Sequence, residues 1–486
     1  MSLTQIKNYI DGQLLAPSSG DYLDNVNPAI GQVYSQVPNS GAPDIDAAVA
    51  SAQKAFPKWA GLSQTKRSEI LCKLADLVDS QRDRLVTAET DDNGKPLRLA
   101  RSVDIPRVSG NLRFYAGVAL GFASESHAMP DGINYTLRNP LGVVGIISPW
   151  NLPLYLLSWK IAPALAMGNC VIAKPSEVTP MTAYLFSELC IQAGMPRSVL
   201  NIVHGNGATT GDAMLTHPGI KAISFTGGTQ TGQHIARTVA PLFKKFSLEL
   251  GGKNPNVIFD DCDYERTIRT SLLSSFANQG QICLCGSRIL VQKTMYERFV
   301  DDFVKRAGQM KVGDPHQPTS DLGAVVSQPH QQKILGCIET AKQEGGNLHC
   351  GGGPVAPSGR CENGYFVQPT VFTGLAADSQ TNQQEIFGPV VSIQPFDNEE
   401  HAIELANGTQ YGLSASVWTN DIGRGHRMAE RIDSGVVWVN TWLVRDLRTP
   451  FGGMKSSGMG REGGQESLRF FTEPKNVFVK YGEPKS

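Results

Sequence analysis

Short apolar runs alternate with longer amphipathic segments from residue 141 onward. The predicted strands cover residues 143–147, 170–173, 200–203 and 220–225, and the predicted helices cover residues 154–167, 182–193 and 229–240. Strands separated by about ten to fifteen helical residues indicate βαβ units around a parallel sheet with helices on both faces. Such a sheet binds nucleotides at the carboxyl ends of its strands. The pattern therefore predicts an α/β domain built on a parallel sheet.

A second series of the same kind begins after Leu250. Its predicted strands cover residues 256–259, 289–291, 390–396, 413–418 and 436–440, and its predicted helices cover residues 264–278, 295–310, 331–344, 401–407 and 426–432. This alternation predicts a second α/β domain. The glycine- and proline-rich residues 351–364 are expected to form a surface loop, and residues 476–479 an exposed strand that pairs with another segment.

Charge and hydropathy argue against two classes of partner. The chain has 44 basic and 45 acidic residues, with no block of like charge, so it lacks the electrostatic field that a nucleic-acid-binding protein needs. One uncharged stretch, residues 140–159, is as long as a membrane span. Because Pro149, Asn151 and Pro153 interrupt it and Lys160 closes it, a strand, a turn and a helix are the better interpretation.

The first residues and the cysteines point to a reducing compartment. Residues 1–8 lack the apolar core of a signal peptide. Nine cysteines are an odd number without zinc-type spacing, and the nine histidines show no ligand spacing either, so no metal site is predicted. A long chain without an export signal keeps its thiols reduced, and a cytoplasmic location is expected.

Three segments place a reactive or polar group beside strand ends and glycines. Cys283 follows a predicted helix and a glycine turn, which suits a thiol presented to a cleft. Glu249 lies between two leucines, an apolar setting that raises a carboxyl pKa toward use as a general base. Asn151 occupies a rigid turn between prolines. Taken singly, these would be a core cysteine, a solvent-facing glutamate and a turn asparagine.

Taken together, these segments resemble the aldehyde dehydrogenase superfamily over nearly the whole chain. The matching stretches are Pro149–Asn151, Lys174–Glu177, Phe225–Gly228 with Gly232, Glu249–Lys253, Gly280–Cys283, Glu385–Pro389 and Pro450–Lys455. Any one match is weak, but seven in the right order and spacing are specific.

The resemblance implies an α/β fold with a Rossmann-like NAD-binding domain, a second α/β catalytic domain and a small β oligomerisation element. The NAD-binding domain is expected at residues 1–120 and 142–252, the catalytic domain at 253–440, and the oligomerisation element at 121–141 and 465–486. An unpaired strand is an aggregation hazard, so a homodimer or homotetramer is the physical expectation.

The resemblance also implies catalytic roles. The Cys283 thiolate attacks the aldehyde carbon, and the Asn151 amide with the Cys283 backbone N–H holds the oxyanion of the thiohemiacetal. Hydride transfer leaves a thioester, and Glu249 activates the water that hydrolyses it to the acid. Lys160 and Glu462 match positions that orient water and relay protons.

NAD is the implied cofactor. Lys174 and Glu177 match contacts to the adenosine ribose, and a carboxylate at this place repels a 2′-phosphate, which favours NAD over NADP. Glu385 matches the contact to the nicotinamide ribose, and Phe387 matches the residue that packs beside it. Trp150 is a further expected cofactor-binding residue. The phosphate turn contains Gly227, Gly228 and Gly232, so the pyrophosphate contact is left to the backbone and a helix N-terminus.

Two arginines indicate the substrate. Arg107 and Arg445 match the substrate tunnel, as does Phe451, and general aldehyde dehydrogenases line this entrance with apolar and aromatic residues. The segments around both arginines resemble the branch that oxidises 2-aminomuconate or 2-hydroxymuconate semialdehyde, substrates that carry a carboxylate remote from the aldehyde. Two guanidinium groups would bind that carboxylate bidentately. The alternative is that both are salt-bridged surface residues, and a broad-specificity aliphatic or aromatic aldehyde dehydrogenase is the alternative function.

Two other functions are disfavoured by residues that the chain retains. Acyl transfer to coenzyme A is disfavoured because relatives of that kind usually lack the glutamate found here at position 249. A non-catalytic binding protein on the same fold is disfavoured because the thiol, the amide and the carboxyl group are all retained. Cys285 is expected to be a packing residue, since a disulfide with Cys283 would be strained.

Overall fold

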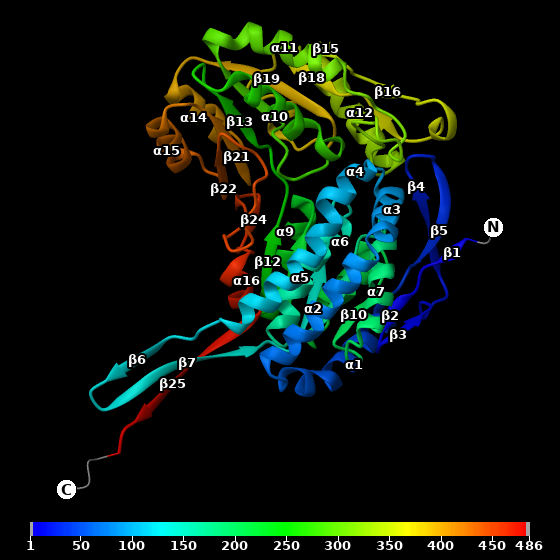
Figure 1. Cartoon of the computed structure of the whole chain (residues 1–486), viewed down its shortest axis with the longest axis vertical. Helices are drawn as coiled ribbons and strands as arrows, with labels where there is room; N and C mark the ends of the chain where they lie inside the picture. Colours follow the sequence, from blue (N-terminus) through cyan, green and yellow to red (C-terminus); the bar gives the residue numbers. More distant parts are fainter. Residues whose placement is uncertain (1–2, 483–486) are drawn as a thin grey trace.

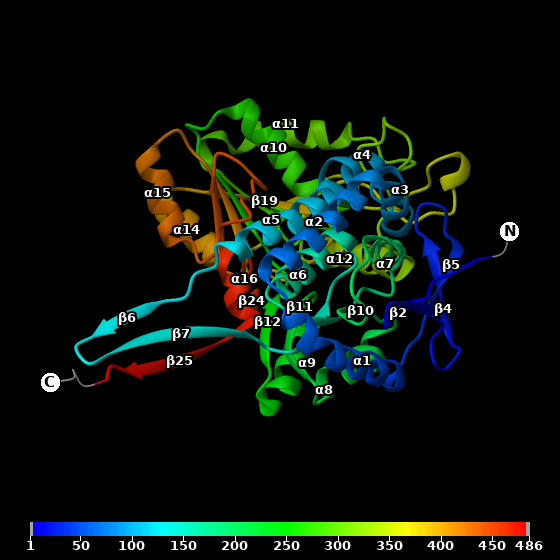
Figure 2. The same ribbon diagram turned by 60° about the horizontal axis from the view of Figure 1, so that its bottom comes forward.

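The computed structural model describes residues 3–482 and contains two α/β lobes and a projecting arm (Figure 1). Residues 1–2 of the predicted NAD-binding domain and 483–486 of the predicted oligomerisation element lie outside the described residues. Figures 1 and 2 both show the arm pointing away from the two lobes. The mixed α/β fold predicted from the sequence is confirmed.

The first lobe is built on an eight-stranded sheet with the order β24-β12-β11-β8-β9-β10-β2-β3. Its parallel core is β8 (Val143–Ile147), β9 (Cys170–Lys174), β10 (Leu200–Ile202), β11 (Ile220–Thr226) and β12 (Lys245–Glu249). The antiparallel edge strands are β2 (Asn8–Ile10), β3 (Gln13–Leu15) and β24 (Gly458–Met459). Helices cover the sheet: α1 (Ala42–Ala60), α2 (Gln64–Ser80), α3 (Arg82–Asn93), α5 (Ile105–Leu120), α6 (Pro153–Ala166), α7 (Met181–Ala193) and α9 (Thr229–Val239).

The strand order of this sheet reverses at β8. From β8 the chain adds β9 and β10 on one side and then β11 and β12 on the other. The strands are almost wholly apolar because helices cover both faces. A crevice at the carboxyl ends of the two strands flanking such a reversal is the usual ligand site of an open α/β sheet. Here those strands are β8, which leads to Asn151, and β11, which leads to Gly227.

The second lobe has a seven-stranded sheet with the order β15-β18-β19-β14-β13-β21-β22. Its parallel strands are β13 (Pro255–Ile258), β14 (Arg288–Gln292), β18 (Thr370–Thr373), β19 (Val390–Phe396), β21 (Ser414–Trp418) and β22 (Val436–Val439), and β15 (Asn347–Cys350) is antiparallel. Its helices are α10 (Tyr264–Phe276), α11 (Tyr296–Gly308), α12 (Gln328–Gln343), α14 (Glu399–Asn407) and α15 (Ile422–Arg431).

The predicted surface loop at residues 351–364 is only partly a loop. β16 (Pro354–Val355) pairs with β17 (Phe366–Val367), and Cys361 is fully buried. Tyr365 donates its backbone N–H to the carbonyl of Pro28 over 2.9 Å. Its composition predicted turns correctly but did not indicate that the segment packs against the N-terminal strands.

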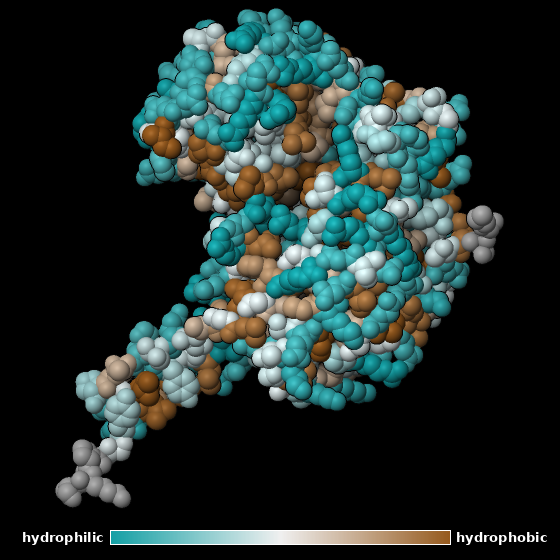
Figure 3. All heavy atoms as spheres, viewed as in Figure 1, coloured by the Kyte–Doolittle hydropathy of each residue, from teal (hydrophilic) through white to brown (hydrophobic). Residues whose placement is uncertain are grey.

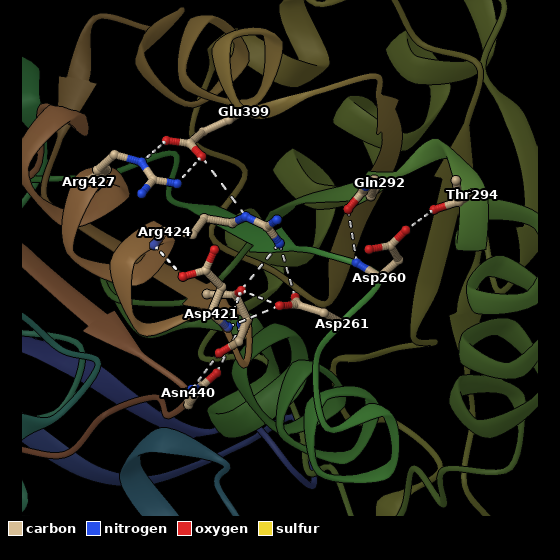
Figure 4. Close-up of polar contacts among 10 residues, drawn as sticks. Asp260, Asp261, Gln292, Thr294, Glu399, Asp421, Arg424, Arg427 and Asn440 are labelled. Atoms are coloured by element: carbon tan, nitrogen blue, oxygen red, sulfur yellow. Dashed lines mark hydrogen bonds and ion pairs between the residues drawn. The ribbon is translucent and has the colours of Figure 1, made fainter.

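Polar side chains bond to one another at the carboxyl ends of the second sheet (Figure 4). Asp261, after β13, accepts hydrogen bonds from Thr419 Oγ1 at 2.9 Å and from Arg424 Nη1 at 3.2 Å. The guanidinium of Arg424 also lies 4.5 Å from the ring centroid of Phe259. Asn440, after β22, donates to the carbonyl of Thr419 at 2.8 Å. The side chains at the carboxyl ends of these strands therefore bond to one another. The reactive residues of this lobe lie at the opposite, amino ends of the strands.

The arm is a three-stranded antiparallel sheet of β6 (Ser126–Met129), β7 (Gly132–Pro140) and β25 (Thr472–Lys480). β25 pairs with β7 from Thr472–Pro140 to Lys480–Gly132, so the exposed, paired strand predicted at residues 476–479 is confirmed. The preceding helix α16 (Gly464–Phe470) belongs to the first lobe, because Leu468 packs in its core. In residues 3–482, every helix is too short or too polar to span a bilayer.

Candidate active site

A cavity of about 790 Å³ lies between the two lobes and brings the predicted reactive residues together. Figure 3 shows apolar side chains gathered in the hollow between the lobes. Among the residues that line the cavity are Cys283, Glu249, Glu462, Arg107 and Arg445. Cys283 also lines a smaller cavity on its other side, which Glu385 and Phe387 share. Cys283 therefore lies at the junction of the two cavities.

Three consecutive residues in left-handed conformation shape the loop that carries Cys283. Asn278, Gln279 and Gly280 have φ of 51°, 57° and 71°. At Gly280 a side chain is impossible, because an added Cβ would lie 2.1 Å from the carbonyl oxygen of Gly388. Beyond the turn, Asn254 Nδ2 donates to the carbonyl of Cys283 at 2.7 Å. The loop is thus fixed on both sides of the thiol.

The electrostatic surroundings of Cys283 show which groups face it. Burial raises its pKa most, and the carboxylates of Glu385 and Glu249 raise it further. Arg445 acts in the opposite direction. The thiol therefore lies within electrostatic reach of residues from both lobes, and burial together with the two carboxylates raises its pKa.

Glu249 is the last residue of β12 and is 4% exposed. Within the described chain neither of its carboxyl oxygens has a hydrogen-bond partner. Burial, and then the neighbouring Glu462, raise the pKa of Glu249 well above its usual value. Gly452 leaves room for the carboxyl group, because an added Cβ would lie 2.7 Å from Oε1. The environment predicted for this residue is confirmed: burial raises the pKa of its carboxyl group.

Asn151 lies in the turn after β8 and is 3% exposed. Its Nδ2 donates to the carbonyl of Gln281, two residues before the thiol, at 2.9 Å. An amide nitrogen carries two N–H groups, so one remains for another acceptor. The turn of the first lobe and the cysteine loop of the second lobe are joined at this contact.

Lys160 and Glu462 form a buried ion pair beside Glu249. Ser224 Oγ lies 3.1 Å from Lys160 Nζ and donates to Glu462 Oε1 at 3.2 Å. Trp159 Nε1 donates to the other carboxylate oxygen of Glu462 at 2.8 Å. These four side chains form a continuous polar path from the sheet interior to the cavity.

The predicted phosphate turn lies at the carboxyl end of β11 and leads into α9. Gly228 precedes the first turn of α9, and nothing lies within 4 Å of a Cβ added there, so the N–H groups at the helix N-terminus are approachable. Gly232 is required for packing, since an added Cβ would lie 2.5 Å from Leu250. After β9, which lies on the other side of β8, Lys174 Nζ donates to Glu177 Oε2 at 3.1 Å.

On the thiol side of this crevice, Glu385 accepts a hydrogen bond from the backbone N–H of Gly252 at 3.0 Å. A Cβ on Gly251 would lie 2.3 Å from Glu385 Oε2, so the glycine admits the carboxylate. The rings of Phe387 and Trp150 meet edge to face with centroids 5.2 Å apart. An open helix N-terminus at one end, and a carboxylate beside aromatic rings at the other, fit an extended dinucleotide.

Three arginines line the cavity, and Arg98 pairs with Asp321 at 3.0 Å. Arg107 and Arg445 have no carboxylate within salt-bridge distance among the described residues. Arg445 instead lies over the rings of Phe451 and Trp159, at 3.8 and 5.4 Å from their centroids. Arg107 lies 5.8 Å from the ring centroid of Tyr155. The nearby Asp446 binds the exposed guanidinium of Arg448 and makes no ion pair with Arg445.

Several residues of the site were not predicted. Trp159 and Ser224 bond Glu462, and Asn254 bonds the cysteine loop. His330 Nε2 donates to the carbonyl of Phe387 at 2.7 Å. Trp159 precedes Lys160 directly, and this adjacency was the one available signal. Cys285 is a free thiol packed among apolar residues, as expected.

The comparisons with known proteins agree with this site. The model of the aldehyde dehydrogenase family matches residues 15–477. The chain is 49% identical to a 2-aminomuconic semialdehyde dehydrogenase of Danio rerio, over 99% of both chains. It is 44% identical to a 2-hydroxymuconic semialdehyde dehydrogenase of Pseudomonas sp. (strain CF600), over 98% of this chain and 100% of the relative. The NAD⁺ complex of an aldehyde dehydrogenase from Bacillus cereus is 40% identical, with a TM-score of 0.95 over 98% of this chain and 96% of that one.

The chain belongs to the aldehyde dehydrogenase family. It is an NAD-dependent oxidoreductase that acts on aldehydes.

Proposed function

We propose that the chain oxidises a semialdehyde bearing a remote carboxylate, such as 2-aminomuconate or 2-hydroxymuconate semialdehyde, to the dicarboxylate. The observation that carries the proposal is Arg445, a cation in the same cavity as Cys283 whose neighbours are aromatic rings. A guanidinium without a carboxylate partner in a largely apolar cavity favours an anionic ligand. The names of the similar Danio and Pseudomonas enzymes support this substrate class.

The proposed chemistry assigns one role to each reactive group. Cys283 attacks the aldehyde carbon, and the free N–H of the Asn151 amide holds the resulting oxyanion with the Cys283 backbone N–H. NAD supplies the hydride acceptor. Glu249 then removes a proton from the water that attacks the thioester, and the unpartnered state of its carboxyl oxygens suits that exchange. Lys160 and Glu462 relay the proton away from the site.

For the cofactor, we propose that Lys174 and Glu177 hold the adenosine ribose. Gly227, Gly228 and Gly232 would allow the pyrophosphate to approach the N-terminus of α9. On the nicotinamide side we assign Trp150, Glu385 and Phe387. For the substrate we assign Arg107, Arg445 and Phe451, which line one cavity.

We also propose that the chain forms a homodimer or homotetramer through its arm. The arm exposes apolar side chains, with Leu137 42%, Phe478 45% and Val479 46% exposed. A projecting sheet with free strand edges pairs readily with a second copy. The predicted domain boundaries stay a prediction, with the arm as the oligomerisation element and with α16 in the first lobe, where Leu468 packs. The nine free thiols support a reducing, cytoplasmic location.

The experiment that tests the function is NADH formation with a matched panel of aldehydes. An acidic semialdehyde and a neutral aldehyde of equal chain length are compared at several concentrations, with and without coenzyme A. We expect the free acid to form without coenzyme A, and a much higher kcat/KM for the acidic member. Equal kcat/KM for both members would support the broad-specificity alternative, and a requirement for coenzyme A would support acyl transfer.

A further inference from the structure

The main-chain carbonyl of Asn151 accepts hydrogen bonds from three buried side chains. Asn278 Nδ2 lies at 3.0 Å, Lys95 Nζ at 3.0 Å and Asn93 Nδ2 at 3.4 Å from this oxygen. All three donors are at most 2% exposed. A carbonyl oxygen has two lone pairs, so three donors saturate it. Three buried side chains therefore fix the backbone of the turn at Asn151.

Asn278 connects this carbonyl to the cysteine loop. Its Nδ2 also lies 3.3 Å from the carbonyl oxygen of Gln281, the same oxygen that accepts the Asn151 side-chain amide at 2.9 Å. In turn, the backbone N–H of Gln281 donates to the carbonyl of Asn278 at 2.9 Å. One side-chain amide thus bonds the backbone of the asparagine turn and the backbone of the thiol loop at once.

Lys95 supplies a positive charge behind the same carbonyl. It follows α3, is fully buried, and pairs with the fully buried Asp104 at 3.0 Å and Glu89 at 3.7 Å. Buried ion pairs seldom increase stability over apolar packing, whereas a charged donor makes a stronger hydrogen bond than a neutral one. The ammonium group therefore acts as a fixed anchor for the Asn151 backbone.

We propose that Asn278, supported by Lys95, is a positioning residue that fixes the Asn151 amide relative to the Cys283 backbone N–H. The proposal rests on the oxyanion role assigned to Asn151 above. Two donors stabilise an oxyanion only if both point at the place where the charge develops. Because Asn151 and Cys283 come from different lobes, their relative position depends on groups that bond the asparagine turn to the cysteine loop. Asn278 is such a group, since its side chain bonds the carbonyls of Asn151 and of Gln281, two residues before Cys283.

The neighbouring Gln279 provides a matched control. It is equally buried and has the same left-handed conformation, with φ of 57° against 51° for Asn278. Its side chain donates to the carbonyl of Ala324 at 2.8 Å and accepts from the N–H of Gly323 at 3.2 Å. It therefore bonds a different segment from the one that Asn278 bonds. Glycine adopts this conformation freely, so Asn278→Gly and Gln279→Gly each remove one side chain without adding backbone strain.

The test compares aldehyde oxidation with alkylation of Cys283 by iodoacetamide. Alkylation is a displacement at saturated carbon and forms no oxyanion. In Asn278→Gly we expect kcat/KM for the aldehyde to fall about 10²-fold, the usual effect of a misplaced catalytic group, while the KM for NAD and the alkylation rate stay unchanged. In Gln279→Gly we expect kcat/KM to fall less than about threefold, because its bonds lead away from Asn151.

A double-mutant cycle decides whether Asn278 acts through Asn151. Once the Asn151 amide is removed by Asn151→Ala, adding Asn278→Gly should cost no further activity. Additive losses, or an alkylation rate that falls in parallel with oxidation, would overturn the proposal, because Asn278 would then act on the thiol or on folding. A fully active Asn151→Ala variant would instead remove the oxyanion role itself.

Lys95 is tested in a charge-balanced background. Lys95→Met alone leaves buried carboxylates without a cation, so it is combined with Asp104→Asn, and folding is checked by circular dichroism and NAD binding. A folded double variant should lose aldehyde oxidation but keep its alkylation rate. A folded double variant with unchanged oxidation would show that Lys95 has no part in the positioning.

Discussion

The guanidinium of Arg445 lies 3.8 Å from the ring centroid of Phe451. Phe451 in turn exchanges two backbone hydrogen bonds of 2.7 Å with Glu462. Arg445 also faces the ring of Trp159, whose N–H bonds the Glu462 carboxylate. Phe451 and Trp159 thus contact Arg445, the proposed substrate-binding cation, and also bond Glu462, a member of the proposed proton relay.

Arg445→Ala should weaken catalysis selectively. We expect kcat/KM for an acidic semialdehyde to fall. The expected loss of transition-state stabilisation is about 2–5 kcal/mol, the usual loss on removing one member of a buried charge pair. A neutral aldehyde of similar length should hardly be affected. Arg448→Ala is the matched control, because this nearby guanidinium is exposed and bound to Asp446. Equal losses on both aldehydes would show that Arg445 maintains the cavity and does not bind the carboxylate.

Glu249→Gln should separate the two chemical steps. Without the base, thioester hydrolysis should slow by about 10²–10⁴-fold, whereas the first turnover still forms NADH. Rapid mixing should therefore show a burst close to one NADH per site, followed by a slow steady rate. A burst and a steady rate that fall together would place Glu249 before hydride transfer.

The buried carboxyl of Glu249 also predicts how stability depends on pH. Its pKa is raised in the folded state, so the folded chain binds this proton more tightly than the unfolded chain. The stabilisation it gives is full below the unfolded pKa and is lost as pH rises through the folded pKa. Glu249→Gln should therefore leave Tm unchanged near about pH 4.5 and raise it increasingly at alkaline pH. A Tm lowered equally at all pH values would contradict the assignment of a buried, protonated carboxyl group.

Glu177→Gln should weaken the preference for NAD over NADP. A hydrogen bond to a charged group contributes about 1.5–3 kcal/mol, so the KM for NAD should rise about tenfold or more, and NADP should become a better cofactor as the repulsion is removed. Glu188→Gln serves as a control, because it breaks an exposed ion pair with Arg84 outside the site. Unchanged cofactor selectivity would remove Glu177 from the ribose contact.

The sheets were predictable because buried parallel strands are continuous apolar runs. β8 and β19 begin and end where the sequence predicted, and α6, α7 and α9 are within one residue of it at each end. The helix α15 begins at Ile422, four residues earlier than predicted, because its first turn contains two glycines and an isoleucine that faces solvent. Hydrophobic periodicity does not register such a turn.

The reactive residues were predictable from their motifs, but their supports were not. Lys95 follows an Asp-Asn-Gly segment that is typical of an exposed turn, and lysine is seldom fully buried. Asn278 lies in a predicted helix, whereas the structure ends α10 at Phe276 and places Asn278 in a left-handed turn. Both residues act through long-range contacts with Asn151, and local sequence carries no information about such contacts.

The most direct test of the account is mass spectrometry of Glu249→Gln after rapid mixing with NAD and an acidic semialdehyde. Acid quenching preserves a thioester, and the peptide containing Cys283 can then be isolated. We predict one acyl group per chain on Cys283, formed at the rate of the NADH burst. Full NADH production with Cys283 unmodified, or undiminished activity in Cys283→Ser, would contradict the central claim.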